Sequence, residues 1–123
     1  MKCRVLIVDD AMFMRNMLRD LFMRADGFEV VGEAVNGQEA VDKYRELSPD
    51  LVTMDIVMPL KSGIEALQEI IAADAAARVI MCSALGQEAL ILEAVKAGAK
   101  DFIVKPFQEA KVLEVVHRVP GIG

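Results

Sequence analysis

The sequence predicts an α/β domain with a doubly wound, mostly parallel sheet of five strands and helices on both faces. Short β-type runs alternate five times with segments of helical periodicity over the 123 residues. Two of the runs, at residues 5–8 and 79–82, are continuously apolar, which is typical of strands that are covered on both faces. Right-handed crossovers between parallel strands place the intervening helices on both sides of such a sheet.

The strands are predicted from apolar runs that end at turn-forming residues. They are expected at residues 4–8, 29–34, 51–54, 78–82 and 101–104. The connections are marked by the turn sequences Asp26-Gly27, Asn36-Gly37, Ser48-Pro49-Asp50, Ser62-Gly63 and Ala97-Gly98. No repeat, low-complexity tract or linker interrupts this alternation, so residues 1–123 are expected to form a single domain.

The helices are predicted from apolar stripes at helical spacing. The first four stripes and the last are carried in turn by Met14, Met17, Leu18, Leu21, Phe22 and Ala25; by Ala40, Tyr44 and Leu47; by Ile64, Leu67 and Ile71; by Leu92 and Val95; and by Val112, Val116 and Val119. In the fourth helix, Leu92 and Val95 are expected to face inward. Leu90 and Ile91 widen its apolar face beyond what the core needs.

The composition excludes several classes of protein. A net charge of −5 leaves no basic face for general nucleic-acid binding. No apolar run approaches the roughly 20 residues that span a bilayer, and no signal peptide is evident, so a cytoplasmic protein without a membrane partner is expected. Cys3 and Cys82 lie in β-type runs, which indicates buried, reduced thiols. His117 is the only histidine and is expected to be a solvated residue in the last turn of a helix, so neither a catalytic triad nor a histidine-rich metal site is expected.

Polar side chains stand directly after four of the five predicted strands. Asp9 and Asp10 follow the first strand, Asp55 the third, Ser83 the fourth and Lys105 the fifth. Ligands of parallel α/β sheets bind beyond the carboxyl ends of the strands. We therefore expect these five side chains to meet at one edge of the sheet.

Three carboxylates that meet at this edge point to a cation. They repel one another, and at least one pKa rises unless a cation joins them. A hard divalent ion with oxygen ligands fits best, and Mg²⁺ is the expected one. With Lys105 and one Mg²⁺ the formal charges sum to zero, so the site could accept a phosphoryl group. A helix cap would explain Asp10 alone, but Asp55 fits that role poorly because Ser62 is the better N-cap of the next helix.

The strand-end motifs, taken together, resemble one protein family. VLIVDD at residues 5–10, DIVMP at residues 55–59 with Gly63, Ser83-Ala84, and DFIVKPF at residues 101–107 are similar to the receiver domain of bacterial two-component response regulators. The resemblance covers the whole chain, and residues 81–87 and 97–102 are most similar to its chemotaxis members. It implies a flavodoxin-like sheet with strand order 2-1-3-4-5 and five helices.

The resemblance implies a role for each acidic residue. Asp55 would accept a phosphoryl group from the phosphohistidine of a sensor histidine kinase. Asp10, Asp55 and the backbone carbonyl of Val57 would hold Mg²⁺, and Asp9 would act largely through water. Positioning and charge neutralisation suffice for phosphoryl transfer. The protein would therefore be a phospho-acceptor switch that catalyses only its own phosphorylation and dephosphorylation, rather than an enzyme with a separate substrate.

The resemblance also implies a switch and an output. Lys105, aimed inward by a cis bond to Pro106, would assist the transfer, and Ser83 would bind a phosphoryl oxygen once the group is attached. Phe102 occupies the switch-aromatic position of the family and would turn inward or outward. With Leu90 and Ile91 it forms a candidate docking surface, whose partner by analogy is the flagellar motor switch protein. A monomer is expected.

The sequence departs from the usual family pattern in the loop after Asp55. Leu60-Lys61 replaces an acidic residue followed by a hydrophobic one, and Lys61 is expected to add positive charge near the metal loop. Val57 and Leu85, two residues beyond Asp55 and Ser83, cannot orient an attacking water. We therefore expect slow autodephosphorylation and a separate phosphatase that resets the switch.

Three other functions compete with this prediction. A phosphorelay intermediate, which passes its phosphoryl group to a histidine phosphotransfer protein, has the same core motifs. A phosphohydrolase of the haloacid-dehalogenase type is disfavoured because its nucleophile follows the first strand in an Asp-x-Asp arrangement, whereas Asp9 and Asp10 are adjacent. A nucleotide- or flavin-binding module is disfavoured because no glycine-rich phosphate motif is present.

Overall fold

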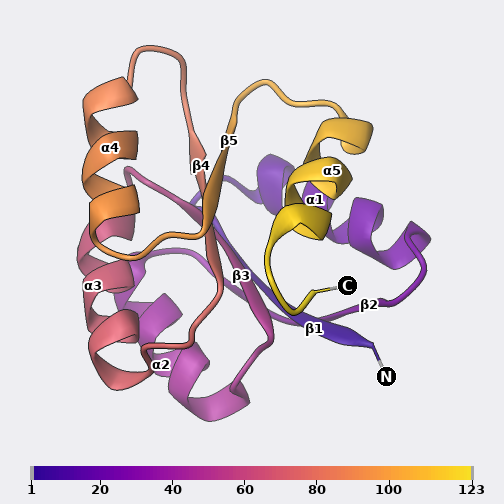
Figure 1. The fold of residues 1–123 in the computed structure, drawn as a ribbon, viewed down its shortest axis with the longest axis horizontal. Coiled ribbons are helices and arrows are strands. Elements are labelled where there is room, and N and C mark those ends of the chain that lie inside the picture. The colour runs from indigo at the N-terminus through magenta and orange to yellow at the C-terminus, as the bar shows by residue number, and fades with distance from the viewer. Residues whose placement is uncertain (1, 123) are drawn as a thin grey trace.

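Strands and helices alternate along the chain in the computed structural model, which describes residues 2–122 (Figure 1). The strands are β1 (Cys3–Val8), β2 (Phe28–Ala34), β3 (Leu51–Asp55), β4 (Val79–Ser83) and β5 (Asp101–Val104). The helices are α1 (Met12–Arg24), α2 (Gly37–Leu47), α3 (Gly63–Ala73), α4 (Glu88–Lys96) and α5 (Glu109–Arg118). No helix among residues 2–122 combines the length and the apolar character needed to cross a membrane.

The five strands form one parallel sheet in the order β2-β1-β3-β4-β5, which confirms the predicted fold class and strand order. Helices α1 and α5 cover one face, and α2, α3 and α4 cover the other (Figure 1). Alternate strand residues therefore enter two separate core clusters. Val5 and Ile7 pack with α1 and α5, whereas Leu6 and Val8 pack on the opposite face. This double burial explains why the strand reads as a continuous apolar run.

The helices that flank the carboxyl edge of the sheet begin in different ways. The side chain of Ser62 caps α3 in a reciprocal capping box with Glu65, as predicted. By contrast, α1 begins after Ala11 without a side-chain cap, so Asp10 is not a capping residue. Asp9 accepts a 2.9 Å hydrogen bond from the backbone N–H of Ala11. The carboxylate of Asp10 is therefore free to act at the sheet edge.

A glycine lets α3 begin in direct contact with the end of β3. The backbone N–H of Gly63 donates to the carbonyl of Ile56 at 2.7 Å. A Cβ at residue 63 would lie 2.0 Å from the carbonyl oxygen of Asp55, far inside van der Waals contact. Only glycine allows this approach, which fixes the backbone around Asp55.

Helix α4 packs with a different face from the one expected, and that prediction was wrong. Leu92 and Val95, expected to face inward, are 56% and 46% exposed. Leu90 and Ile91 instead pack against the core, on the same face as the fully buried Ala94. Four apolar side chains spread around the helix do not select one face. The small Ala94 marks the buried face because it lets the helix lie close to the sheet.

Both cysteines are free thiols, as predicted. Cys82 is buried, and burial raises its pKa to about 12, so the thiol stays protonated. Cys3 is only partly buried, at the opposite end of the sheet, so the expectation of full burial was wrong for this residue. Cys3 is the first residue of β1, and the first two residues of this strand are only partly buried whereas the last four are buried.

We predict that Gly63→Ala lowers the free energy of unfolding by about 3 kcal/mol, because the new Cβ meets backbone that cannot rotate away. Gly32→Ala is the matched control. Its Cβ would lie 2.7 Å from Cδ1 of Leu47, a side-chain end that can move, so a loss of about 1 kcal/mol is expected. Urea denaturation of both variants measures the difference. Equal losses would contradict the special role of the contact between Gly63 and Asp55.

Candidate functional site

The carboxyl edge of the sheet brings the predicted polar residues together. Asp55 and Ser83 are the last residues of β3 and β4, one residue further than predicted for both strands. Asp9 and Lys105 each follow a strand by one residue. Parallel pairing aligns these ends, because Asp55 is opposite Cys82 and the N–H of Lys105 donates to the carbonyl of Ser83 at 2.7 Å.

The acidic residues of this edge form a compact cluster. One carboxylate oxygen from each of Asp9, Asp10 and Asp55 lies within 4.8 Å of the others. Asp9 is 1% exposed, whereas Asp10 is exposed and Asp55 lies between these extremes. Burial and the charge of Asp9 raise the pKa of Asp55, and Lys105 opposes them only in part. The cluster therefore favours the binding of a cation.

Lys105 supplies the positive charge nearest to these carboxylates. Its Nζ lies 2.9 Å from Oδ2 of Asp9 and 3.4 Å from Oδ1 of Asp55. Burial by itself would lower the pKa of Lys105, but the hydrogen bond with Asp9 and the charge of Asp55 outweigh burial and raise it. Lys105 is therefore a stable ammonium group. The bond between Lys105 and Pro106 is cis, as the resemblance implies.

Two buried hydroxyl groups at or near this edge lack a hydrogen-bond partner among the residues that the structure describes: Oγ of Ser83 and Oγ1 of Thr53. Both residues are completely buried. Buried polar groups without partners are uncommon in folded proteins and cost stability. Ser83 ends β4 beside Asp55, so an oxygen-rich group bound at Asp55 would give its hydroxyl a partner.

The donor set of the cluster fits Mg²⁺. Three carboxylates offer only hard oxygen ligands, and one ammonium group leaves a negative surplus that a divalent cation can neutralise. Val57, whose backbone carbonyl is the further ligand implied by the resemblance, lies in the loop after β3 and is 58% exposed. The acidic pocket is therefore consistent with Mg²⁺ binding.

Two of the predicted switch and docking residues, Ile91 and Phe102, line an apolar groove. Its volume is about 280 Å³, and it runs from residues 84–88 to Ile91, Phe102 and Val104. Phe102 is 39% exposed, and Ile91 is partly buried and packs against the core. Leu90 also packs against the core and does not line this groove. The structure thus groups Ile91 with Phe102 at the groove, and Leu90 packs next to Ile91 against the core.

Lys61 does not act as a free charge beside the acidic cluster, contrary to expectation. Its Nζ forms an ion pair with Glu69 of α3, and its backbone carbonyl accepts from the N–H of Gly37 at 3.0 Å. The aliphatic part of Lys61 also packs against Gly37. Lys61 therefore links α2 to α3, and its charge is compensated away from the metal loop.

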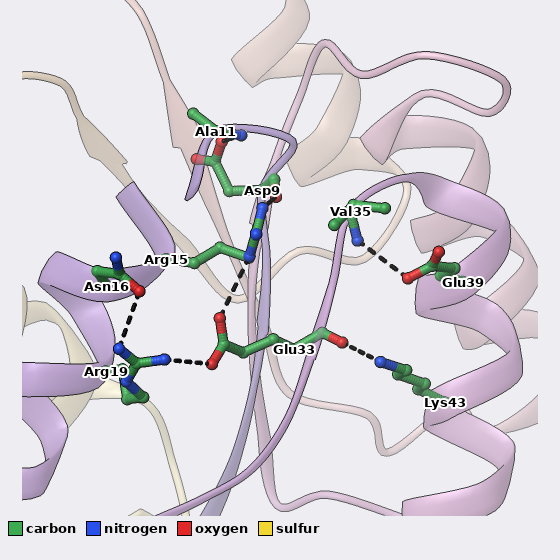
Figure 2. A network of polar contacts seen from close by, with 9 residues as sticks. All are labelled: Asp9, Ala11, Arg15, Asn16, Arg19, Glu33, Val35, Glu39 and Lys43. Atoms are coloured by element: carbon green, nitrogen blue, oxygen red, sulfur yellow. Dashed lines mark hydrogen bonds and ion pairs between the residues drawn. The ribbon is translucent and has the colours of Figure 1, made fainter. Parts of the chain in front are cut away.

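The sequence patterns did not single out Arg15 and Glu33. Arg15 contacts the acidic loop after β1, and Glu33 holds Arg15 in place. Arg15 donates from Nη1 to the carbonyl oxygen of Asp9 at 2.8 Å, and its Nε lies 3.2 Å from Oε1 of Glu33 (Figure 2). Arg15 follows Asp10 by five residues. A basic residue one turn into the helix after an acidic loop is the feature of the sequence from which a contact with that loop could have been predicted. Nothing in the local pattern pairs it with Glu33.

Comparison with known proteins identifies the family. The family model for the response regulator receiver domain matches residues 5–117. The chain belongs to the response regulator receiver family. It is 61% identical to the chemotaxis protein CheY of Thermotoga maritima over 116 residues, which cover 94% of this chain and 96% of that protein. It is also 61% identical to CheY of Bacillus subtilis, with 94% and 95% of the two chains covered.

Solved structures show the same receiver fold. CheY in a complex with CheX, BeF3 and Mg from Borrelia burgdorferi matches with a TM-score of 0.89 at 47% identity, covering 94% of this chain and 87% of that one. The response regulator domain of CheB from Thermotoga maritima matches with a TM-score of 0.87 at 43% identity, covering 97% and 96%. The protein is therefore a CheY-like receiver domain, and these relatives support a signalling switch of the chemotaxis response regulator type.

We predict that Asp55→Asn stabilises the chelator-treated protein near neutral pH. Because the pKa of Asp55 is raised above 3.8, the folded state binds this proton more tightly than the unfolded state does. The free energy of unfolding therefore falls as pH rises through the interval between 3.8 and the folded pKa, and the substitution removes that loss. Urea denaturation across this pH range measures it.

Asp26→Asn, which changes an exposed aspartate in the turn before β2, is the control for general charge effects. Mg²⁺ should stabilise the parent protein more than the Asp55→Asn variant, because binding to the folded state alone raises stability. If the Asp55→Asn variant is no more stable than the parent protein without metal, the charge of Asp55 does not destabilise the folded state.

Proposed function

We propose that Asp55 is the phospho-acceptor of a two-component response regulator and takes its phosphoryl group from the phosphohistidine of a sensor histidine kinase. One observation carries the proposal: a carboxylate at the end of the central strand lies 3.4 Å from an ammonium group and within 4.8 Å of two further carboxylates. That arrangement combines a nucleophile, a fixed cation and a divalent metal site at one point.

The transfer requires positioning and charge neutralisation rather than a protein acid or base. An oxygen of Asp55 forms a bond to phosphorus while the bond from phosphorus to the donor imidazole nitrogen breaks. Asp10, Asp55 and the carbonyl of Val57 would hold Mg²⁺, and Asp9 would act on it largely through water. Mg²⁺, when bound, neutralises charge on the phosphoryl oxygens. The complex of CheX and CheY from Borrelia burgdorferi contains BeF3 and Mg, which supports this ligand class.

Lys105 and Ser83 act on the phosphorylated state. Lys105 lies between Asp9 and Asp55, so its ammonium group is placed to bind a phosphoryl oxygen. Phosphorylation places close to two negative charges and several acceptor oxygens at Asp55. Ser83 then donates its hydroxyl, which has no partner among residues 2–122, to one of those oxygens. Movement of Ser83 makes room for Phe102 to turn inward.

The output surface lies at the groove beside Phe102. Leu90, Ile91 and Phe102 belong to this surface in the proposal, and Ile91 and Phe102 line the groove directly. The partner is the flagellar motor switch protein, and a separate phosphatase resets the switch. The chemotaxis names of the relatives support the output, and the matched complex of CheY with CheX supports recognition by a second protein.

The remaining expectations are part of the same proposal. Residues 1–123 act as one receiver domain, which functions as a cytoplasmic monomer without nucleic-acid or membrane partners. The single five-stranded sheet and the near-complete coverage of the CheY relatives support one domain. The net charge of −5 supports protein partners rather than nucleic acid.

We predict that incubation with acetyl phosphate and Mg²⁺ adds one phosphoryl group to the protein, and that Asp55→Asn abolishes the addition. The amide cannot act as the nucleophile. Intact-protein mass spectrometry gives the readout, and omission of Mg²⁺ should abolish labelling of the parent. The control Asp26→Asn should be labelled at the parental rate. Labelling of Asp55→Asn at that rate would refute Asp55 as the acceptor.

We predict that Val57→Asn speeds loss of the phosphoryl group several-fold. Val57 is 58% exposed beside Asp55 and has no polar side-chain atom to orient an attacking water, whereas an asparagine amide does. Decay of the isolated phosphoprotein is followed by phosphate release. Val57→Leu keeps the side chain apolar and should decay as the parent does. Identical decay of Val57→Asn would contradict slow autodephosphorylation through Val57.

A further inference from the structure

We infer that Arg15, held in place by Glu33, is a positioning residue that sets the orientation of the acidic loop and thereby the affinity of the site for a divalent cation. The inference rests on the proposed function of the acidic cluster. It adds to the cluster two residues, Arg15 and Glu33, and the contact that Arg15 makes with it is to the backbone carbonyl of Asp9 rather than to a carboxylate. Figure 2 shows the network: Arg15 reaches from α1 to the loop after β1, and Glu33 reaches it from β2.

The key contact is between a side chain and the backbone of the loop. Nη1 of Arg15 donates to the carbonyl oxygen of Asp9 at 2.8 Å. That carbonyl belongs to the peptide bond between Asp9 and Asp10, and peptide bonds are planar. Fixing the carbonyl therefore fixes the peptide plane that leads into Asp10, the exposed member of the carboxylate cluster. Asp10 does not cap α1, which begins after Ala11 without a side-chain cap.

The same loop is attached to β2 at a second point. The N–H of Asp9 donates to the carbonyl of Ala34 at 3.1 Å, which continues the parallel pairing in which Ile7 is opposite Glu33. Both polar backbone groups of Asp9 are thus anchored on this side, the N–H by β2 directly and the carbonyl by Arg15. Because Arg15 is itself paired with Glu33, β2 is the common support of both anchors.

Glu33 is placed to hold one rotamer of Arg15. Its Oε1 lies 3.2 Å from Nε of Arg15, and its Oε2 lies 3.0 Å from Nη1 of Arg19. Arg19 also donates to Oδ1 of Asn16 at 2.9 Å, and Lys43 donates to the backbone carbonyl of Glu33. The Arg15 side chain is only 12% exposed, so this pairing is protected from water more than an ordinary surface ion pair is.

Charge and position predict opposite effects for Arg15. As a cation beside the acidic loop, Arg15 repels Mg²⁺, so its charge alone weakens metal binding. As a restraint on the peptide between Asp9 and Asp10, it strengthens binding, because ligands held in place lose less freedom when the metal binds. Outer-sphere supports of this kind change metal affinity by about 10-fold to 100-fold. Replacing Arg15 by a neutral residue therefore distinguishes the two effects: Mg²⁺ binding becomes tighter if charge dominates and weaker if positioning dominates.

The test measures Mg²⁺ affinity of the full chain by isothermal titration calorimetry. Arg15→Gln is expected to weaken binding about tenfold, although it removes a repelling charge. Glu33→Gln should weaken it in the same direction. The double variant should be no weaker than Arg15→Gln, since Glu33 acts through Arg15. Arg19→Gln is the matched control, because Arg19 binds Glu33 but not Asp9. The Mg²⁺ affinity of this variant should stay within about twofold of that of the parent.

A second variant guards against a trivial folding defect. Arg15→Lys keeps the charge but cannot bond Glu33 and the Asp9 carbonyl with one planar fork, so it too should weaken Mg²⁺ binding. A readout without metal is hydrogen exchange at the amide of Ala11, which donates to Oδ1 of Asp9 at 2.9 Å. That amide should exchange faster in Arg15→Gln and Arg15→Lys, while the amide of Ile7 in β1 should not.

The outcomes separate this inference from the proposed function. Mg²⁺ binding equal to or tighter than that of the parent in both Arg15 variants, with unchanged exchange at Ala11, would overturn the positioning role and leave the proposed function standing. A parent protein that binds no Mg²⁺ would refute the metal site itself. Weaker binding in Arg19→Gln equal to that in Arg15→Gln would overturn the assignment to Arg15, because it would show that the ion-pair network around Glu33, and not the contact of Arg15 with Asp9, sets the affinity.

Discussion

The repulsion among Asp9, Asp10 and Asp55 is the constraint on which the rest of the site depends. A folded chain does not gain stability by gathering three carboxylates within 4.8 Å, one of them 1% exposed, around a single ammonium group. The gathering persists because pairing with neighbouring strands fixes the backbone of Asp9 and Asp55, and Asp10 follows Asp9 directly. The sheet imposes the geometry, and the surplus negative charge becomes the driving force for binding a cation.

The features around the cluster act mainly to hold that backbone. Gly63 brings the start of α3 against the carbonyl of Asp55, and Lys61 joins α2 to α3 at the same loop. On the other side, Arg15 binds the carbonyl of Asp9. The contacts of Gly63 and Arg15 involve main-chain atoms of Asp55 and Asp9 rather than their carboxylates. They restrain the loops without neutralising the charge that the site needs.

Sequence patterns predicted what depends on periodicity and failed where several arrangements share one pattern. The bounds of β5 and the strand ends that carry Asp55 and Lys105 follow from apolar runs and the polar residues behind them. The inward face of α4 was predicted wrongly because this helix carries apolar side chains on several sides. The sequence did not mark Ala94 as the residue of the buried face. The pairing of Arg15 with Glu33 joins residues 18 positions apart on different elements. Both elements carry more than one charged residue, such as Arg19 on α1 and Glu29 on β2, so the pattern does not say which of them pair.

Ser83 connects the charge cluster to a change of shape in energetic terms. A buried hydroxyl without a partner costs about 1–3 kcal/mol, and in the proposed phosphorylated state this cost is relieved when a phosphoryl oxygen accepts a hydrogen bond from it. A differential stabilisation of that size shifts a two-state equilibrium by roughly 5-fold to 150-fold. In the proposed switch, the residue that changes position is Phe102, which lines the groove. A single hydrogen bond that only one state can form is therefore large enough to bias a switch, provided that the two positions of Phe102 differ by no more than a few kcal/mol.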